Sequence, residues 1–317
     1  MPVTAEQIKE AARECGFELA GVAAALPSTD FSRFAAWREQ EFAGEMHYLT
    51  DRRGDVRADP RNLLPTAKSI VCAGKLYNTP HPHTQDIQDP KRGWISRYAW
   101  GADYHDVLRD GLESLVRRIA VLHPEPFDHK ICVDTAPLLE RSYAQAAGLG
   151  WIGKNTCLIN QQQGSWFFLG ELLLSIPLAP DSPPPGRCGS CTRCIDACPT
   201  AALVPDGAGG WTLDARSCIS YLTIEKRGEI RSDLTEKISD HVFGCDICKD
   251  VCPWKRRAPT TEDPAFQPSC FAPRLDVLSE LSEDDFRRMF RGSPVKRTKY
   301  SGFVRNVAIA LGNSHTS

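Results

Sequence analysis

The sequence predicts an α+β protein with an N-terminal α/β domain, a cysteine-rich middle domain and a short helical C-terminal region. Three observations support this prediction. Helix-like and strand-like patterns alternate over the first 180 residues, eight of the thirteen cysteines lie between residues 188 and 252, and about the last forty residues have a helical pattern. A chain of 317 residues, 42% hydrophobic and 25% charged, is long enough for two or three domains.

The first twenty residues, MPVTAEQIKEAARECGFELA, have the spacing of an amphipathic helix that contains acidic residues. They have neither the apolar run of a signal peptide nor the length of a membrane span. We therefore expect a cytoplasmic protein with no membrane partner, in which crowded cysteines bind metal rather than form disulfides. The formal net charge of −2 excludes a strong overall attraction to nucleic acid, so such a partner requires a local basic patch.

The N-terminal domain contains three segments that we expect to be strands and one that we expect to be a long helix. The helix covers residues 103–122, where apolar residues recur at i, i+3 and i+4. The strands are short apolar stretches rich in β-branched residues, at 68–77 (KSIVCAGKLY), 129–137 (HKICVDTAP) and 164–178 (GSWFFLGELLLSIPL).

Two proline-containing linkers mark the domain boundaries. The connector PLAPDSPPPGR leads into the first cysteine run, and KRRAPTTEDPAFQP follows Trp254. We therefore place the domains at residues 1–180, 181–258 and 259–317. In the last of these, SEDDF offers a serine cap and first-turn acids for a helix that continues into RRMF.

Residues 188–199 read CGSCTRCIDACP, which is the C-x2-C-x2-C-x3-C-P run of bacterial ferredoxins. Three of its thiolates bind one [4Fe-4S] cluster and the fourth binds a neighbouring cluster. A second run, CDICKDVCP, lacks only its first cysteine, where Val242 stands, and Cys218 supplies the eighth thiolate. We predict a ferredoxin-like domain with two clusters, one bound by Cys188, Cys191, Cys194 and Cys252, the other by Cys198, Cys218, Cys245 and Cys248.

Three alternatives stay open at this point. Structural zinc prefers paired C-x2-C knuckles separated by a longer loop, which this spacing fits poorly. A single cluster with spare thiols is the second, and His241 as a ligand in place of Cys218 is the third, although an exposed histidine at a helix end is commoner. The remaining cysteines, which we expect to be small apolar residues without a ligand role, are Cys15, Cys72, Cys132, Cys157 and Cys270.

Short motifs do not identify what accepts the electrons of these clusters. The sequence has no C-x3-C-x2-C radical motif, no C-x-x-C-H haem motif and no G-x-G-x-x-G after a strand. The stretch DYHDVLRDG, from Asp103, half resembles the D-x-H-x-x-G corrinoid signature, but Leu108 stands at the glycine position. We therefore expect His105 to be an ordinary histidine on a helix surface.

Six longer strings carry further information: VDTAPLLERSYAQAAGLGWIGKNTCLIN, ISRYAWGADYH, GSWFFLGELLL, DARSCISYLTIE, FGCDICKDVCPWKR and GSPVKRTKYSGFVRNVAIALGN. Together they resemble the epoxyqueuosine reductase family, and the resemblance extends from RADPRNLLPTA to VAIALGN. It implies a relative of the corrinoid reductive dehalogenases, with a nitroreductase-like, cobalamin-binding N-terminal domain. It also implies the final step of queuosine synthesis, in which epoxyqueuosine in the tRNA anticodon loop is reduced by electrons that pass from the clusters to cobalamin.

Removal of an epoxide oxygen consumes two electrons and two protons, and the oxygen must be protonated as the C–O bond breaks. We expect Asp134 to be this general acid, because it follows the apolar strand KICV and precedes a helix with an early Pro137. Its position also matches the proton donor of the family. We expect burial against the corrin to raise its pKa more than the helix N-terminus lowers it. The alternative is that Asp134 only caps the following helix.

The resemblance implies further cofactor contacts. Each of these residues is also consistent with a loop position that satisfies backbone groups, and Glu140 and Arg141 are consistent with a surface pair. Because the glycine of the corrinoid signature is absent, we expect no histidine beneath the cobalt. The expected cofactor contacts are Arg57, Ser96, Arg97, Tyr98, Asp134, Lys154, Asn155 and Cys157.

The C-terminal region is basic although the whole chain is slightly acidic. No Asp or Glu follows Phe286, whereas seven Lys or Arg residues do, a pattern that neutralises phosphates. The target base must leave its stack to reach a buried cofactor, and Tyr300 and Phe303 are candidates to stack on bases. The alternative is a solvated basic helix face with Phe303 in the core. The expected tRNA contacts are Tyr221, Arg287, Arg291, Lys296, Arg297, Lys299 and Arg305.

Two rival functions stay open. A reductive dehalogenase uses the same cofactors on a small organohalide, but it needs an enclosed apolar pocket and no basic C-terminal region. A non-catalytic two-cluster electron carrier leaves about 180 N-terminal residues without a role. For the reductase we expect a monomer whose partners are tRNA carrying epoxyqueuosine and an electron donor such as a flavodoxin, a ferredoxin or a reductase.

Overall fold

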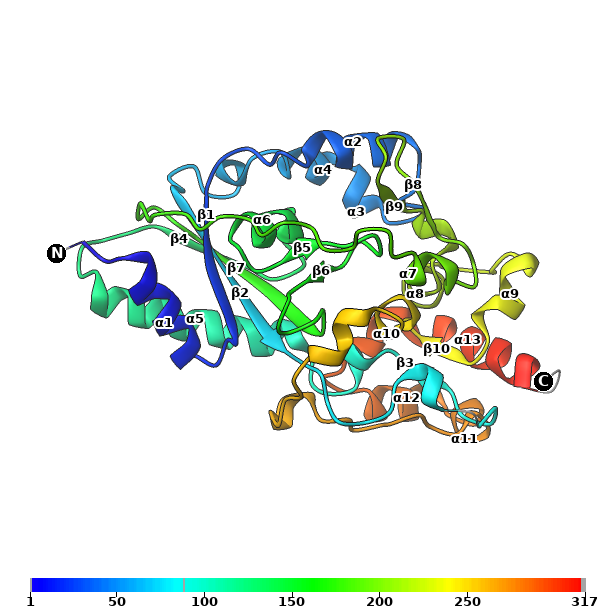
Figure 1. Cartoon of the computed structure of the whole chain (residues 1–317). Helices are drawn as coiled ribbons and strands as arrows, with labels where there is room; N and C mark the ends of the chain where they lie inside the picture. Colours follow the sequence, from blue (N-terminus) through cyan, green and yellow to red (C-terminus); the bar gives the residue numbers. More distant parts are fainter. Residues whose placement is uncertain (1, 88, 315–317) are drawn as a thin grey trace.

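The N-terminal half of the protein is built around an antiparallel sheet with the strand order β1-β2-β7-β4 (Figure 1). The structure is a computed structural model that describes residues 2–87 and 89–314. β2 and β7 are the central strands and pair over their full lengths. The strands are β1 (Leu19–Ala24), β2 (Ser69–Leu76), β4 (His129–Cys132) and β7 (Phe167–Leu174).

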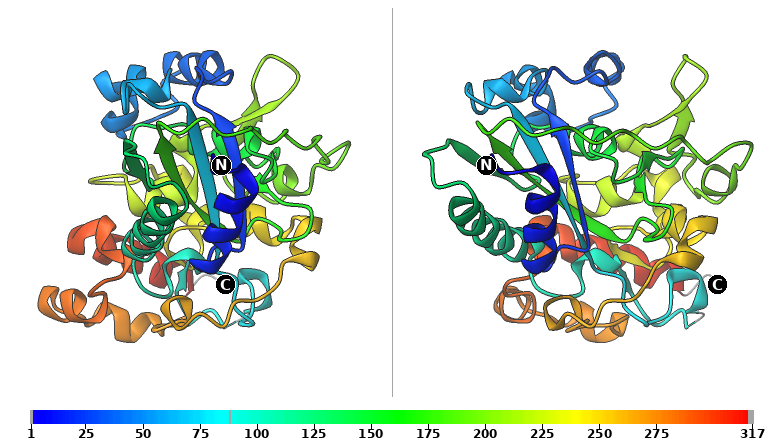
Figure 2. Two further views of the ribbon diagram at one scale, coloured as in Figure 1. Left: turned by 90° about the vertical axis from the view of Figure 1, so that its left-hand side faces the viewer. Right: turned by 60° about the vertical axis from the view of Figure 1, so that its left-hand side comes forward.

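Helices cover both faces of this sheet. On one face, α1 (Ala5–Glu14) and α5 (Tyr104–Leu122) lie side by side, and on the other lies α6 (Glu140–Ala146) (Figures 1 and 2). Side chains of β7 alternate between the two faces, as the pleat requires. Phe168 and Leu172 belong to the core beneath α1 and α5, whereas Phe167 and Leu173 belong to the core beneath α6.

The predicted elements of this domain are present, but the prediction of an α/β domain is wrong. The segments expected to be strands contain β2, β4 and β7, and the expected long helix is α5, which begins at its N-cap Asp103. The mixture of helices and sheet is therefore confirmed. All pairs in the sheet are antiparallel, so the domain is α+β rather than α/β, because alternation of helix and strand along a chain does not determine strand direction.

Short helices and hairpins surround the sheet. Figure 2 shows the β8–β9 hairpin extending away from the sheet, and Arg33 and Trp37 of α2 donate to the carbonyls of Trp211 and Leu213 in that hairpin. The elements of this part are α2 (Phe31–Glu39), α3 (His47–Thr50), α4 (Arg52–Val56), β5 (Trp151–Ile152), β6 (Leu158–Ile159), β8 (Leu203–Pro205) and β9 (Trp211–Leu213).

The cysteine-rich and C-terminal segments are mostly short helices. Their elements are α7 (Arg193–Asp196), α8 (Ile219–Ile224), α9 (Ser232–Ile238), β10 (His241–Phe243), α10 (Ile247–Asp250), α11 (Leu275–Ser279), α12 (Glu283–Met289) and α13 (Lys299–Ser314). Short 3-10 helices connect these and earlier elements at Pro60–Asn62, Thr84–Asp86, Arg97–Ala99, Ala215–Ser217, Pro253–Arg257, Pro264–Phe266 and Pro294–Thr298. The predicted serine cap is confirmed, since Ser282 and Asp285 form a capping box at the start of α12.

A third core joins the C-terminal region to a segment from the N-terminal half. β3 (Trp94–Ile95) pairs in parallel with β10, and Trp94 and Trp100 pack with Leu275 and Phe303. The division at residues 180 and 258 stays a prediction, and this core includes residues from both sides of it. Among the described helices, none has the combined length and apolar character needed to cross a membrane.

Candidate active site and cluster-binding region

Asp134 occupies a sharp turn between β4 and α6. Its backbone φ is +52°, in the left-handed region that L residues rarely adopt, and its N–H donates to Glu140 Oε1 at 2.6 Å. α6 begins at Glu140 with Leu139 as its N-cap, so the alternative that Asp134 only caps this helix is wrong. The Asp134 side chain is 52% exposed and lines a cavity.

His105, in the first turn of α5, pairs with Asp134. Its Nε2 lies 3.3 Å from Asp134 Oδ2, and its Nδ1 lies 2.7 Å from Asp103 Oδ1. Burial lowers the pKa of His105, but hydrogen bonds to the two carboxylates outweigh burial and raise that pKa to about 9. His105 is therefore a cation at neutral pH that contacts the predicted general acid, and the prediction of an ordinary surface histidine is wrong.

This pair changes the electrostatics expected for Asp134. Burial raises the pKa of Asp134, but the hydrogen bond and charge of His105, and then the charge of Arg297, hold it below its ordinary value. The net effect of the described residues is therefore to lower this pKa, because an imidazolium faces the carboxylate. A rise caused by burial against the corrin stays a prediction. At neutral pH the shared proton lies on His105 Nε2, which donates a hydrogen bond to Asp134 Oδ2.

Two further carboxyl groups lie behind Asp134. The surface pair of Glu140 and Arg141 is not formed, since Arg141 Nη1 donates to Thr156 O at 2.9 Å and Glu140 accepts from the backbone of Asp134. Glu171 of β7 is fully buried and hydrogen bonds to Glu140. Sequence reasoning missed Glu171, although a carboxyl group within the apolar run FFLGELLL was an available signal.

A cavity of about 770 Å³ lies beside these groups. Its walls come from the turn after β4, the first turn of α6, helices α2 to α4 and strand β9. Of the residues predicted to contact the cofactor, Arg57 and Asp134 line it, and so does Arg297 from the predicted tRNA contacts. A cavity of this size suits a cofactor or small substrate. Arginines on its walls favour the binding of anionic groups. These arginines are Arg33, Arg53, Arg57, Arg141 and Arg297.

The predicted cluster cysteines form two groups in space. Burial, and then the neighbouring Cys252, raises the pKa of Cys194 to about 11, and burial, then Cys245, raises that of Cys218 to about 12. Similar contacts join Cys194 to Cys188 and Cys191, and Cys218 to Cys198 and Cys248. Thiols with such pKa values need the charge of a metal to become thiolates, so these donors fit two clusters.

A single-ion site does not arise from these groups. Within the part of the chain that the structure describes, no three His, Cys, Asp or Glu side chains converge on a point that one metal ion would fill. His241 lies in β10 and is 2% exposed, so the expected exposed histidine at a helix end is wrong. Its Nδ1 lies 2.9 Å from Ile238 O. Cys218 is close enough to Cys245 and Cys198 for their charges to raise its pKa, and its role as the eighth ligand stays a prediction.

The loop after β5 contacts both cysteine runs. Lys154 Nζ donates to the carbonyls of Gly189 at 2.8 Å and Cys191 at 3.1 Å. Asn155 Nδ2 donates to Cys248 O at 3.2 Å. The Cys157 thiol hydrogen bonds to Cys248, and this bond lowers the pKa of Cys157 to about 6. The structure thus places these three predicted cofactor contacts against the cluster-binding segments. Ile152 and Thr156, from the same loop, line the cavity.

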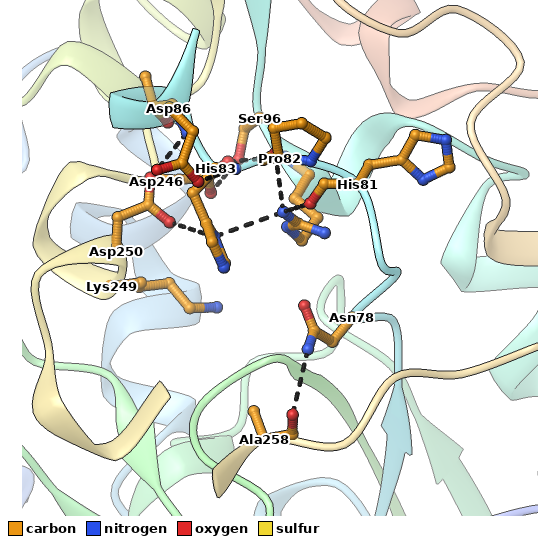
Figure 3. Close-up of polar contacts among 12 residues, drawn as sticks. Asn78, His81, Pro82, His83, Asp86, Ser96, Asp246, Lys249, Asp250 and Ala258 are labelled. Atoms are coloured by element: carbon orange, nitrogen blue, oxygen red, sulfur yellow. Dashed lines mark hydrogen bonds and ion pairs between the residues drawn. The ribbon is translucent and has the colours of Figure 1, made fainter. Parts of the chain in front are cut away.

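Ser96 and Arg97 belong to a buried polar network around α10 (Figure 3). Asp246, just before α10, accepts from Ser96 Oγ at 2.7 Å and from Arg97 N at 2.8 Å. Asp250, the last residue of α10, pairs with His83 Nδ1 at 2.7 Å. Because Asp246 and Asp250 alternate with the cluster cysteines, this network fixes the second cysteine run against the segment that follows β2.

Aromatic rings extend from this network toward Asp134. Lys249 Nζ hydrogen bonds to the Tyr77 hydroxyl and lies 4.3 Å from the ring centroid of Trp166. Tyr104 stacks on Phe168 with centroids 4.4 Å apart, and it also stacks on the ring of its neighbour in α5, the histidine that contacts Asp134. Tyr98, a further predicted cofactor contact, lies edge-on to Tyr104 at 6.2 Å.

The predicted tRNA contacts differ in their surroundings. Tyr221 is 7% exposed and accepts from Glu45 N at 2.8 Å. Arg305 donates to backbone carbonyls at the end of α8 and in the following loop, including that of Leu222 at 2.7 Å. The exposed contacts are Arg287, Arg291, Lys296, Arg297 and Lys299.

The aromatic residues of α13 do not form a stacking surface. Phe303 is fully buried in the C-terminal core, so the prediction that it stacks on a base is wrong. Its helical spacing places it on the inner face of α13, which agrees with the alternative prediction that Phe303 lies in the core. The Tyr300 hydroxyl donates to Leu281 O at 2.8 Å, and its ring lies 5.9 Å from that of Phe286.

Two family models match the chain. The model described as "Epoxyqueuosine reductase QueG, DUF1730" matches residues 57–135, and the model described as "4Fe-4S double cluster binding domain" matches residues 187–255. Several curated relatives are named epoxyqueuosine reductase. The relative from Xanthomonas campestris is 40% identical over 98% of this chain and 87% of its own length. The relative from Escherichia coli is 39% identical over 98% of this chain and 81% of its own length. The Gloeobacter violaceus relative is 42% identical over 100% of this chain and 98% of its own.

Solved structures of the same kind are also similar. One is a crystal structure of epoxyqueuosine reductase with an epoxyqueuosine-modified tRNA-Tyr stem loop, with a TM-score of 0.87, 30% identity and coverage of 98% of this chain and 81% of that one. Another is the Bacillus subtilis epoxyqueuosine reductase, described with its catalytic aspartate loop swung out of the active site. Its TM-score is 0.85, at 31% identity and the same coverage of the two chains.

Proposed function

The chain belongs to the epoxyqueuosine reductase family, and we propose that it reduces epoxyqueuosine to queuosine in the anticodon loop of tRNA. The observation that carries this proposal is one cavity that is lined both by the predicted proton donor and by the loop that contacts the cluster-binding cysteines. Asp134 lines it on one side, and Ile152 and Thr156 line it from the loop that contacts both cysteine runs. A proton donor and an electron source therefore meet at one site.

The iron–sulfur clusters are the electron source, as the match to a double-cluster domain supports. We assign their ligands to the two groups of cysteines described above. A flavodoxin, ferredoxin or reductase is the class of donor that suits such clusters, because each passes electrons singly at low potential. We expect the protein to act as a monomer.

We assign the 770 Å³ cavity to cobalamin. Its mixed apolar and cationic walls suit a large ring with an anionic tail, and Arg57 and Arg53 would face such a group. Bound there, cobalamin would take electrons from the clusters and supply two-electron reduction of the epoxide. Arg57 is already held in place, because its Nη1 donates to the carbonyls of Tyr48 and Arg53.

His105 holds, and Asp134 transfers, the proton that is needed when the C–O bond breaks. His105 is the cation of the pair, so its Nε2 holds the proton at neutral pH. Asp134 Oδ2 takes this proton and transfers it to the epoxide oxygen, which otherwise leaves as an unstable alkoxide. The similar B. subtilis protein is described with a catalytic aspartate loop, which supports this role for the Asp134 turn.

Exposed cations of the C-terminal region, one of which lines the cavity, suit the phosphates of a tRNA loop. Arg297 lines the cavity and pairs with Glu225, while Arg291, Lys296 and Lys299 are exposed on the same C-terminal stretch. The similar structure that contains a modified tRNA stem loop supports this kind of substrate. An organohalide would not require these cations, and an electron carrier would not require the cavity.

The test is anaerobic reconstitution with iron, sulfide and cobalamin, followed by assay on tRNA that contains epoxyqueuosine. We expect turnover by the wild type, and at least about 100-fold slower turnover by Asp134→Asn, since general acid catalysis contributes that much. Asp106→Asn, an exposed aspartate of α5, is the matched control and should retain activity. Equal activity of the two variants would refute the acid assignment, and a wild type without corrinoid affinity would refute the proposed function.

A further inference from the structure

The sheet contains a carboxyl group where none is expected. Glu171 lies in central strand β7, directly between Cys72 of β2 and Cys132 of β4, and has no solvent exposure. Among the described residues, no N–H group and no hydroxyl group donates a hydrogen bond to either of its oxygens. An ionised carboxylate in such a position costs several kcal/mol, so this group keeps its proton.

The single polar contact of Glu171 in the described structure is a second carboxyl group, that of Glu140 at the start of α6. Two carboxyl groups hydrogen bond only if at least one is protonated, because an ionised carboxylate has no donor. Burial, and then the charge of Asp134, raise the pKa of Glu140 to about 8. Burial likewise raises the pKa of Glu171 well above its ordinary value.

Within the described part of the chain, no Lys, Arg or His side chain forms an ion pair with either carboxyl group. Charges face it from three places: Asp134 in the turn after β4, Arg141 on α6 itself, and Arg57 at the end of α4. The arginines donate to backbone carbonyls. From β2 and β4, the sheet presents the thiols of Cys72 and Cys132, whose pKa values burial raises, so both are neutral.

Glu140 connects this buried proton to the reaction site. Its carboxyl oxygen accepts from the backbone N–H of Asp134, and its side chain lines the cavity, whereas Glu171 lies behind it. Asp134 supplies one proton, and loss of the epoxide oxygen as water consumes a second. His105 and Asp134 have by then given up the proton that they shared, so a neighbouring group that still holds a proton can supply the second one.

We propose that the Glu140–Glu171 pair holds the second proton of the reaction and that Glu140 delivers it to the departing hydroxyl group, with Glu171 as the positioning residue. This inference rests on the proposed function. Two electrons from the clusters reduce the epoxide, both C–O bonds break, a C=C bond forms, and the oxygen leaves as water with one proton from Asp134 and one from Glu140. Solvent then reprotonates Glu140 through the cavity.

The first test is infrared spectroscopy of the reconstituted protein at pH 7, which detects the carbonyl band of a protonated carboxyl group. We expect this band in the wild type and its loss in Glu171→Gln, because the new amide donates to Glu140 and stabilises its charge. Glu140→Gln should keep a band from Glu171. Glu113→Gln, an exposed residue of α5, is the control and should match the wild type. A wild type without the band would overturn the proposal without any use of a variant.

The second test is the pH dependence of single-turnover reduction. We expect the alkaline limb of Glu171→Gln to lie at least one pH unit below that of the wild type, which makes it about 10-fold slower at pH 8. Near pH 5.5 it should approach the wild-type rate, a recovery that lost packing does not produce. Glu140→Gln should be about 100-fold slower at every pH. An unshifted limb in Glu171→Gln overturns the proposal, whereas an inactive wild type refutes the proposed function and leaves the infrared result valid.

Discussion

In the proposed reaction, three residues from three different elements hold or transfer protons. His105 comes from α5, Asp134 from the turn after β4, and Glu140 from α6, and each contacts its neighbour directly. The charges of the three differ because their surroundings differ. His105 has two carboxylate partners and is cationic, Asp134 faces that cation and is anionic, and Glu140 faces another carboxyl group and is neutral.

Replacement of His105 by glutamine tests its role. His105→Gln keeps a donor near Asp134 but removes the proton that Nε2 carries, so we expect single-turnover reduction to be about 100-fold slower at pH 7. Binding of the tRNA stem loop should not change, because His105 does not line the cavity. His123→Gln, at the other end of α5, is the control. Equal rates for the two variants would show that Asp134 obtains its proton elsewhere.

At the same scale, the sequence identified Asp134 but not the groups that set its charge. Its place after an apolar strand was visible in the order of residues, because strand ends are local features. His105 was set aside since Leu108 replaces a signature glycine, yet contact with a residue 29 positions away does not depend on that glycine. Glu140 and Glu171 meet only when α6 packs on the sheet, which no local spacing shows.

At the scale of elements, local patterns were informative and non-local pairings were not. The cysteine spacing predicted the two groups of thiols because at least half of each group comes from one short run, and the spacing of ferredoxin runs indicates which cysteine belongs to the neighbouring cluster. The directions of β1, β2, β4 and β7 follow instead from connections that helices make across the sheet. The pairing of β3 with β10 joins residues about 150 positions apart, so no sequence window contains it.

The network around α10 depends on one buried arginine. Arg97 is 2% exposed and donates to the carbonyls of Thr79 at 2.8 Å, His81 at 2.9 Å and Pro82 at 3.0 Å. Its guanidinium group also lies 4.4 Å from the ring centroid of Trp100. These bonds hold the chain between β2 and β3, which in turn holds α10 and its cysteines (Figure 3).

Arg97→Met removes these donors but keeps much of the side-chain volume. Because buried carbonyls lose their partners, we expect the unfolding free energy to fall by about 2 kcal/mol and Tm to fall by roughly 5 °C. The iron content after reconstitution should fall as well, since the second cysteine run loses its support. Arg109→Met, an exposed arginine of α5, is the control. A variant with normal Tm and iron content would show that the network does not position the clusters.

At the scale of the whole molecule, charge is distributed unevenly although its total is only −2. Acids and bases of α12 largely cancel, because Arg287 pairs with Glu283 and Arg288 with Asp285. Beyond that helix, Arg291, Lys296 and Lys299 are exposed, and the described residues offer none of them an ion-pair partner within 4.0 Å. The basic region available to a phosphate backbone is therefore smaller than the count of basic residues indicates.

This difference predicts which cations bind tRNA. Lys296→Ala and Lys299→Ala should each weaken binding of an epoxyqueuosine stem loop and reduce the slope of log Kd against log salt by about 0.7 to 0.9, as expected for one lost phosphate contact. Arg287→Ala should change the slope much less, because its partner Glu283 already neutralises it. Titrations between 50 and 200 mM salt measure these slopes with the reconstituted protein. If Arg287→Ala lowers the slope as much as the lysine variants, helix α12 also lies against the tRNA, and local ion pairing does not decide the docking surface.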